Sequence, residues 1–204
     1  ELLVETSAGS LENIQRLGAA AGSPEAVDLA LVQGGTADAE NRHLALGIAS
    51  VYFEPIWVFQ RSDLVRDKLA DLEGSALAVG PPGSGTRRVA LELLAENGID
   101  ERSARILPLG GEAAGEALLR VELDVVFLIA SAESPSVQRL LRSPGVRLMD
   151  FERADAYTRR HRHLSSVSLP RGVIDLDLDL PPQDVQLLAV SANLVVRPDL
   201  HPAL

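Results

Sequence analysis

The stretch whose residue types most clearly suit ligand binding is a glycine-rich turn, VGPPGSGTRR, at residues 79–88. A short apolar run precedes it, and apolar residues follow at helical spacing, at Val89, Ala90, Leu93 and Leu94. The stretch therefore predicts a strand, a turn and an amphipathic helix. Backbone N–H groups at the start of such a helix carry partial positive charge and bind small anions, so this turn is a candidate anion-binding site.

The same turn does not match a nucleotide-binding P-loop. A P-loop places Lys and then Ser or Thr directly after its last glycine, whereas Gly85 is followed by Thr86 and Arg87. An acid that holds magnesium should end a downstream apolar strand, but Asp124 precedes the run VVFLI. Two interpretations of the turn remain: a helix start that binds a carboxylate, or a tight turn in which Ser84 or Thr86 is only the N-cap.

Composition narrows the class of protein further. The chain has 204 residues and a net charge of −10, without the Lys/Arg stripe that nucleic acid requires, so we expect no nucleic-acid partner. It has no cysteine, which excludes disulfides and thiolate chemistry. No apolar run approaches the ~18 residues of a membrane span and no signal peptide is recognisable, so we expect any targeting or anchoring segment to lie outside this chain.

The histidines do not form a recognisable catalytic or metal motif. His43 and His201 are isolated, and neither HxxxH, HExxH nor Gly-x-Ser-x-Gly occurs. His161 and His163 lie in the basic run RRHRH at residues 159–163, which favours a solvated or interfacial basic cluster. We therefore expect no catalytic residue, no metal and no cofactor.

Strand and helix patterns alternate through most of the chain, which predicts an α/β protein with parallel sheets covered on both faces by helices. The last fifth differs, with two strand patterns and no long helix between them. Alternating Asp and Leu at residues 175–180 predict an exposed edge strand or an extended loop with solvated aspartates. The expected strands are 2–5, 28–33, 48–60, 76–79, 105–107, 123–129 and 146–149, and the expected helices begin near residues 10, 86, 112 and 136.

Small polar residues follow four of the predicted strands. They lie at residues 6–10, 33–36, 83–87 and 130–131, and Ser10 is expected to be the N-cap of the first helix. In open α/β sheets the carboxyl ends of strands and the starts of helices converge on a ligand cleft. A cleft lined by hydroxyls, amides and helix N-termini suits an anionic or zwitterionic small molecule.

Six segments together resemble the TAXI family of solute-binding proteins, the extracytoplasmic receptors of tripartite ATP-independent periplasmic (TRAP) transporters. The segments are VETSAGSLENIQRL, VDLALVQGGTAD, VYFEPIWVF, LADLEGSALAVGPPGSGTR, LPLGGEAAGEALL and ANLVVRPDLHPAL, in the family's order across nearly the whole chain. The resemblance implies a type 2 periplasmic-binding-protein-like fold, in which two α/β lobes are joined by hinge strands around an interlobe cleft. It also implies an opening strand ahead of residue 1, which this sequence does not contain.

Under this resemblance, lobe one comprises residues 1–60 and 165–204, lobe two comprises residues 61–164, and the hinge crossings are 48–60 and 164–174. Ser84, Thr86 and the backbone of Gly85 would hold a solute carboxylate, with Arg87 as a possible partner. Further contacts are expected from the turns of both lobes and from an apolar wall. The remaining expected ligand-binding residues are Thr6, Ser10, Gln33, Gly34, Tyr52, Pro55, Gly83 and Ser131.

The resemblance implies a periplasmic receptor without catalytic activity. It would capture a small anionic or zwitterionic solute, such as glutamate, glutamine or an organic acid, and deliver it to TRAP membrane subunits. Two alternatives remain open: the ligand-sensing domain of a LysR-like transcription regulator, which has a similar two-lobed fold, and a phosphate-handling enzyme.

Overall fold

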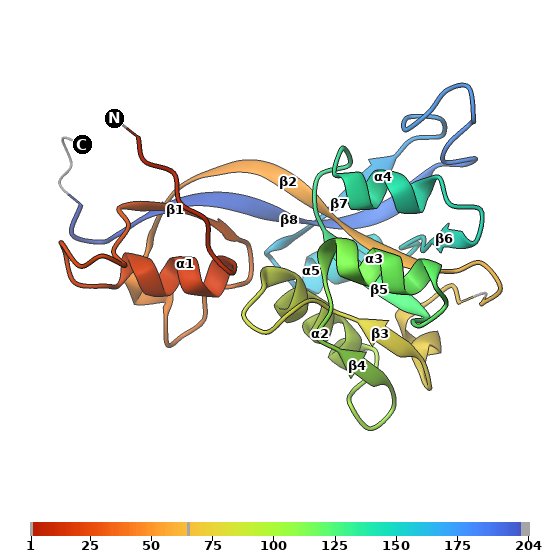
Figure 1. The fold of residues 1–204 in the computed structure, drawn as a ribbon, viewed down its shortest axis with the longest axis horizontal. Helices are drawn as coiled ribbons and strands as arrows, with labels where there is room; N and C mark the ends of the chain where they lie inside the picture. Colours follow the sequence, from red (N-terminus) through yellow and green to blue (C-terminus); the bar gives the residue numbers. More distant parts are fainter. Residues whose placement is uncertain (1, 65, 201–204) are drawn as a thin grey trace.

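A computed structural model describes residues 2–64 and 66–200 of the chain. It contains one sheet with helices packed on both of its faces (Figure 1). The α-helices are α1 (Ser10–Leu17), α2 (Gly85–Glu96), α3 (Gly111–Leu119), α4 (Pro135–Leu141) and α5 (Ala154–Arg160). The strands are β1 (Leu29–Gln33), β2 (Leu46–Arg61), β3 (Ala76–Ala78), β4 (Arg105–Leu107), β5 (Val125–Ile129), β6 (Val146–Leu148), β7 (Leu164–Leu169) and β8 (Val185–Val196). Two short 3₁₀ helices, η1 (Arg42–Leu44) and η2 (Leu69–Leu72), lie between strands.

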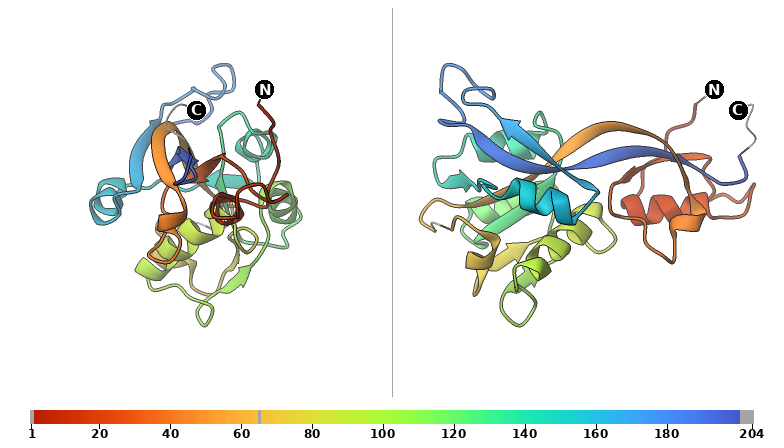
Figure 2. Two further views of the ribbon diagram at one scale, coloured as in Figure 1. Left: turned by 90° about the vertical axis from the view of Figure 1, so that its left-hand side faces the viewer. Right: turned by 180° about the vertical axis from the view of Figure 1, so that it is seen from behind.

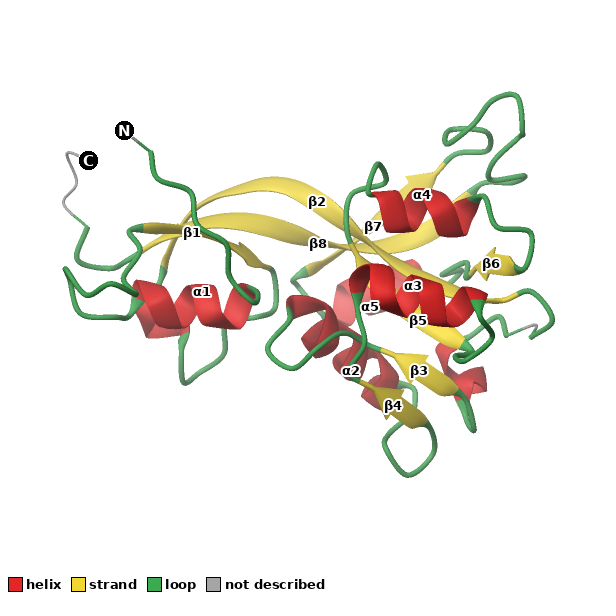
Figure 3. Cartoon of the chain, viewed as in Figure 1, coloured by secondary structure: helices red, strands yellow, loops and turns green. Residues whose placement is uncertain are grey.

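The sheet is mixed, not parallel as the sequence predicts. Its strand order is β1-β8-β2-β5-β3-β4, with β6 also paired to β2 and β7 to β8 (Figure 3). Only β3 pairs in parallel, with β4 and with β5, while the other pairs are antiparallel. The parallel pairs are confined to residues 76–129. Helices continue to alternate with β6 and β7, but these two strands pair antiparallel with the long strands β2 and β8.

Two long strands run the length of the molecule. β2 has 16 residues and β8 has 12, and they pair from Leu46 opposite Val196 to Ile56 opposite Leu188. They connect a smaller end, which holds α1, β1 and η1, to a larger end that holds the other α-helices (Figures 1 and 2). The proposed division into two lobes at residues 60 and 165 stays a prediction.

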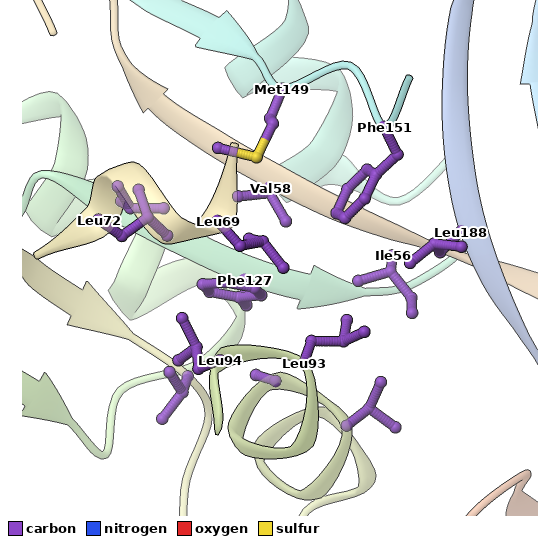
Figure 4. Close-up of a cluster of buried hydrophobic side chains, with 14 of the residues drawn as sticks. Ile56, Val58, Leu69, Leu72, Leu93, Leu94, Phe127, Met149, Phe151 and Leu188 are labelled. Atoms are coloured by element: carbon purple, nitrogen blue, oxygen red, sulfur yellow. The ribbon is translucent and has the colours of Figure 1, made fainter. Parts of the chain in front are cut away.

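The larger end has two apolar layers, one on each face of the sheet. Because side chains alternate along a strand, Ile56 and Val58 of β2 face one layer while Trp57 and Phe59 face the other. The first layer packs against α2, as Leu93 and neighbouring side chains illustrate in Figure 4, and the second packs against α3 and α4. The indole N–H of Trp57 donates to the carbonyl of Ala130 at 2.9 Å, which fixes the ring within its layer.

A small cluster of Ile14, Leu17, Val32 and Val195 holds α1 against β1 and β8. The two ends of the molecule therefore have separate apolar packing and share the strands β2 and β8. This arrangement places the start of α1, from one end, next to the start of α2, from the other.

Three segments differ from the predictions or extend them. Residues 2–5 form no strand, because no strand in the described residues pairs with them, and Leu3 is 82 % exposed. Residues 175–180 form a loop with one bridge between Asp175 and Leu180, so the loop alternative is confirmed. Helix α5 was not predicted.

None of the helices in the described ranges has the length and apolar character needed to span a membrane.

Candidate functional site

A cavity of about 240 Å³ lies where the starts of α1 and α2 meet the end of β1 and the middle of β2. It brings together six of the residues predicted to bind ligand, from segments far apart in the sequence. They are Ser10, Gln33, Tyr52, Ser84, Gly85 and Thr86. The cavity is the candidate functional site of this chain.

The start of α2 supplies backbone donors to this cavity. Ser84 is the N-cap: its hydroxyl accepts from the N–H of Arg87 at 3.1 Å and donates to the carbonyl of Pro81 at 2.8 Å. Ser84 therefore caps α2, and carboxylate binding at the same helix start stays a prediction. The N–H groups of Gly85 and Thr86 precede the first intrahelical bond, so they remain able to bind an anion.

The start of α1 is built differently from the prediction. Gly9, with a φ of 140°, occupies the N-cap position, and Ser10 is the first helical residue. The hydroxyl of Ser10 instead accepts from the N–H of Gln33 at 3.0 Å, which ties α1 to the end of β1. The prediction that Ser10 caps the helix is wrong, because glycine reaches the positive φ that this turn needs and frees the hydroxyl for β1.

The starts of the two helices lie in close contact. A Cβ placed on Gly9 would lie 3.4 Å from both the carbonyl oxygen of Gly83 and the Cα of Ser84. Two helix N-termini therefore contribute partial positive charge to one small volume. Their combined field favours a carboxylate at this place.

Gln33 connects the helix starts to an acidic residue. Its side-chain Nε2 donates to Oε2 of Glu54 at 3.1 Å. Its Oε1 is buried and has no hydrogen-bond partner among the described residues. Leaving such a carbonyl unpaired typically costs about 1–3 kcal/mol.

Glu54 lines the cavity and was not among the predicted site residues. Burial raises the pKa of its carboxyl above the ordinary value of 4.5, and the hydrogen bond from Gln33 opposes that shift. Burial, and then the charge of Glu54, also raise the pKa of Tyr52. The signal in the sequence is a single acid within the apolar run VYFEPIWVF, which suggests either a solvent-facing side chain or a buried functional carboxylate.

Three predicted residues near the loops lie outside the cavity lining. The guanidinium of Arg87 lies 3.4 Å from the carbonyl of Gly80, back along its own turn. Gly83 is an exposed turn residue with a φ of 82°. Ser131 follows β5 and donates to the carboxylate of Glu133.

The other three predicted residues lie in the smaller end of the molecule and in β2. Thr6 is exposed, and its carbonyl accepts from Arg16 at 3.4 Å. The N–H of Gly34 donates to the carbonyl of Ser191 at 2.7 Å, which anchors the turn after β1 on β8. Pro55 lies opposite Ala189 in the β2–β8 pair. A ligand-binding role for each of these six residues stays a prediction.

Comparison with known proteins places the chain in a family. It belongs to the NMT1-like family, whose model matches residues 1–204. A Xanthomonas citri protein bound to ATP has a TM-score of 0.61 at 16 % identity, over 96 % of this chain and 64 % of that one. An ancestral arginine-binding protein bound to arginine has a TM-score of 0.54 at 13 % identity, over 93 % of this chain and 64 % of that one.

A third similar structure is the ligand-binding domain of AvGluR1 in complex with phenylalanine. It has a TM-score of 0.53 at 12 % identity, over 98 % of this chain and 64 % of that one. The predicted fold class is confirmed: the chain has the mixed α/β architecture of type 2 periplasmic binding proteins. It spans less than two-thirds of the length of each of these three structures.

Proposed function

We propose that this chain forms the ligand-capturing part of a solute-binding receptor, and that the cavity binds a small zwitterion such as an amino acid. One observation carries the proposal: two helix N-termini and a partly buried carboxylate, Glu54, line the same cavity. A ligand with both charges complements this arrangement better than a simple anion does, because a simple anion would face the carboxylate of Glu54 without compensation.

The proposed contacts follow from these charges. The ligand carboxylate accepts from the N–H groups of Gly85 and Thr86 at the start of α2. The ligand ammonium lies near the carboxylate of Glu54, which also lines the cavity. A volume of about 240 Å³ suits a ligand smaller than the drug-sized molecules that fill pockets of roughly 300–1,000 Å³.

The receptor would act by changing shape, not by catalysis. The cavity is lined by α1 and β1 of the smaller end and by α2 of the larger end, so a ligand there contacts both. Such a ligand favours the closed arrangement to the extent that its contacts are better in that arrangement. The resemblance to the TAXI family supports a periplasmic location and TRAP membrane subunits as the partners that recognise the closed form.

A thermal-shift screen of the chain with amino acids, dicarboxylates and nucleotides tests the proposal. We expect at least one amino acid to raise the melting temperature, since a ligand at 100 times its dissociation constant adds about 2.7 kcal/mol of stability. Glu54→Gln should abolish that shift, while the exposed-site control Glu101→Gln should retain it. Stabilisation by nucleotides alone, or an amino-acid shift unchanged in Glu54→Gln, would contradict the proposal.

A further inference from the structure

A second polar cluster lies outside the cavity, between α2 and the junction of α5 with β7. Its members are Glu92 of α2, His161 at the end of α5 and His163 just before β7. The sequence pattern favours a solvated or interfacial cluster here. In the structure both imidazoles are largely buried: 13 % of the His161 side chain and 22 % of the His163 side chain are exposed.

The three side chains converge on one point. Nδ1 of His161 lies 2.8 Å from Oε1 of Glu92, and Nε2 of His163 lies 3.1 Å from Oε2 of the same carboxylate. One donor atom from each residue lies within 4.8 Å of the other two. Ligand atoms around a zinc ion, at bond lengths of about 2.0–2.2 Å, lie roughly 3–3.5 Å apart, so small side-chain movements would produce a metal site.

One nitrogen of each imidazole ring lacks a hydrogen-bond partner in the part of the chain that the structure describes. Nε2 of His161 and Nε2 of His163 are both buried without a hydrogen-bond partner among the described residues, although carboxylate oxygens lie close to them. A buried nitrogen without a partner is destabilising, and a metal ion at the centre of the cluster would supply one for His163.

A second carboxylate, that of Glu96, lies beside the ring nitrogen of His161 that does not face Glu92. Oε2 of Glu96 lies 3.2 Å from Nε2 of His161, on the opposite side of the ring from Glu92. Arg160 holds Glu96 through two contacts, at 2.8 Å and 3.1 Å. Metal-bound histidines commonly direct their other ring nitrogen at a carboxylate, which orients the ring.

We propose that Glu92, His161 and His163 bind one divalent transition-metal ion of the zinc class. Two imidazoles and one carboxylate are typical zinc ligands, and three protein ligands leave a fourth position for water. The ring of His163 also packs on Gly35, where a Cβ would lie 2.6 Å from its Cδ2. The ion would therefore connect α2 and the start of β7 close to the turn that follows Gln33.

Isothermal titration of ZnCl₂ into the whole chain, in a buffer that does not chelate metals, tests this site. We expect one ion per chain, with an affinity at least tenfold lower in Glu92→Gln and in His161→Gln. The matched control is His43→Gln, because His43 is exposed in η1 and is not part of the cluster. Equal affinity in Glu92→Gln and the wild type would overturn the proposal.

Cobalt absorption gives a measurement that does not depend on the variants folding. Co²⁺ bound to two imidazoles and a carboxylate in a four-coordinate site should give visible bands that saturate at one equivalent in the wild type and disappear on adding excess Zn²⁺. The absence of saturable bands together with no stoichiometric zinc binding by the wild type would overturn the site. His201 lies outside the described residues, so His201→Gln is measured alongside, and loss of binding in that variant alone would also overturn the proposed ligand set.

Discussion

The side-chain oxygen of Gln33 lies against the backbone of Gly85, so that a Cβ at residue 85 would overlap it and lie 3.1 Å from the Cβ of Gln33. Gly85 begins α2 and its φ lies outside the positive region that requires glycine. The need for glycine here is thus steric: it comes from the close approach of β1 and α2. This contact fixes the amide of Gln33 between the helix start and Glu54.

Gly85→Ala should impair the cavity more than the fold. The added methyl group displaces the flexible amide of Gln33 from Glu54, so we expect at least a tenfold loss of affinity for the best ligand from the thermal-shift screen. The control is Gly115→Ala, because a Cβ there meets Leu140 at ordinary contact distances of 3.6–3.9 Å. Gly115→Ala should raise the free energy of unfolding by up to about 1 kcal/mol with unchanged affinity. Unchanged affinity in Gly85→Ala would argue against the position assigned to Gln33.

Glu54 should make stability depend on pH in a defined direction. Its pKa in the folded chain is raised above 4.5, so the folded state holds the proton more tightly than the unfolded state does. The resulting stabilisation is complete below the unfolded pKa and is lost as pH rises through the folded pKa. The free energy of unfolding of the wild type, minus that of Glu54→Gln, should therefore fall as pH rises from 4 through the raised pKa of Glu54. Urea titrations between about pH 4 and 7 measure this difference, and a constant or rising difference would contradict the raised pKa.

Asp124 should be structural, since it ties three strands together. Its Oδ2 accepts from the N–H of Ala76 at 2.8 Å, and its Oδ1 lies 3.4 Å from Nη1 of Arg61. Asp124→Ala leaves the N–H of Ala76 without this acceptor, so we expect a loss of about 1–3 kcal/mol. Asp63→Ala removes the other, more exposed carboxylate partner of Arg61 and should leave the urea midpoint near that of the wild type. Equal midpoints for the two variants would contradict this role.

The sequence predicts those features that depend on neighbouring residues. The glycines and the helical spacing after residue 85 predict the turn and α2, and Ser84 is the N-cap because its own side chain reaches the next turn. The apolar runs predict the positions of most strands. The two-lobed fold class rests on the order of six segments across the chain, which local pattern alone would not provide.

The features that the sequence does not predict depend on distant partners. β8 inserts between β1 and β2, and an apolar pattern does not specify which strand it pairs with. Residues 2–4 are as apolar as a strand but have no partner to pair with in the described structure. The burial of Glu54 depends on Gln33, and that of His163 depends on Glu92 and Gly35, so no local motif marks either residue.

The strand order determines when paired strands can meet during synthesis, which proceeds from the amino end. β1 and the first half of β2 are complete by residue 54. Strand β8, which lies between them in the sheet and pairs with both, begins only at residue 185. At about 5–20 residues per second, a ribosome needs several seconds or more to reach it. The segment around α1 must therefore wait, without its pairing partner, until residues 185–196 have been synthesised.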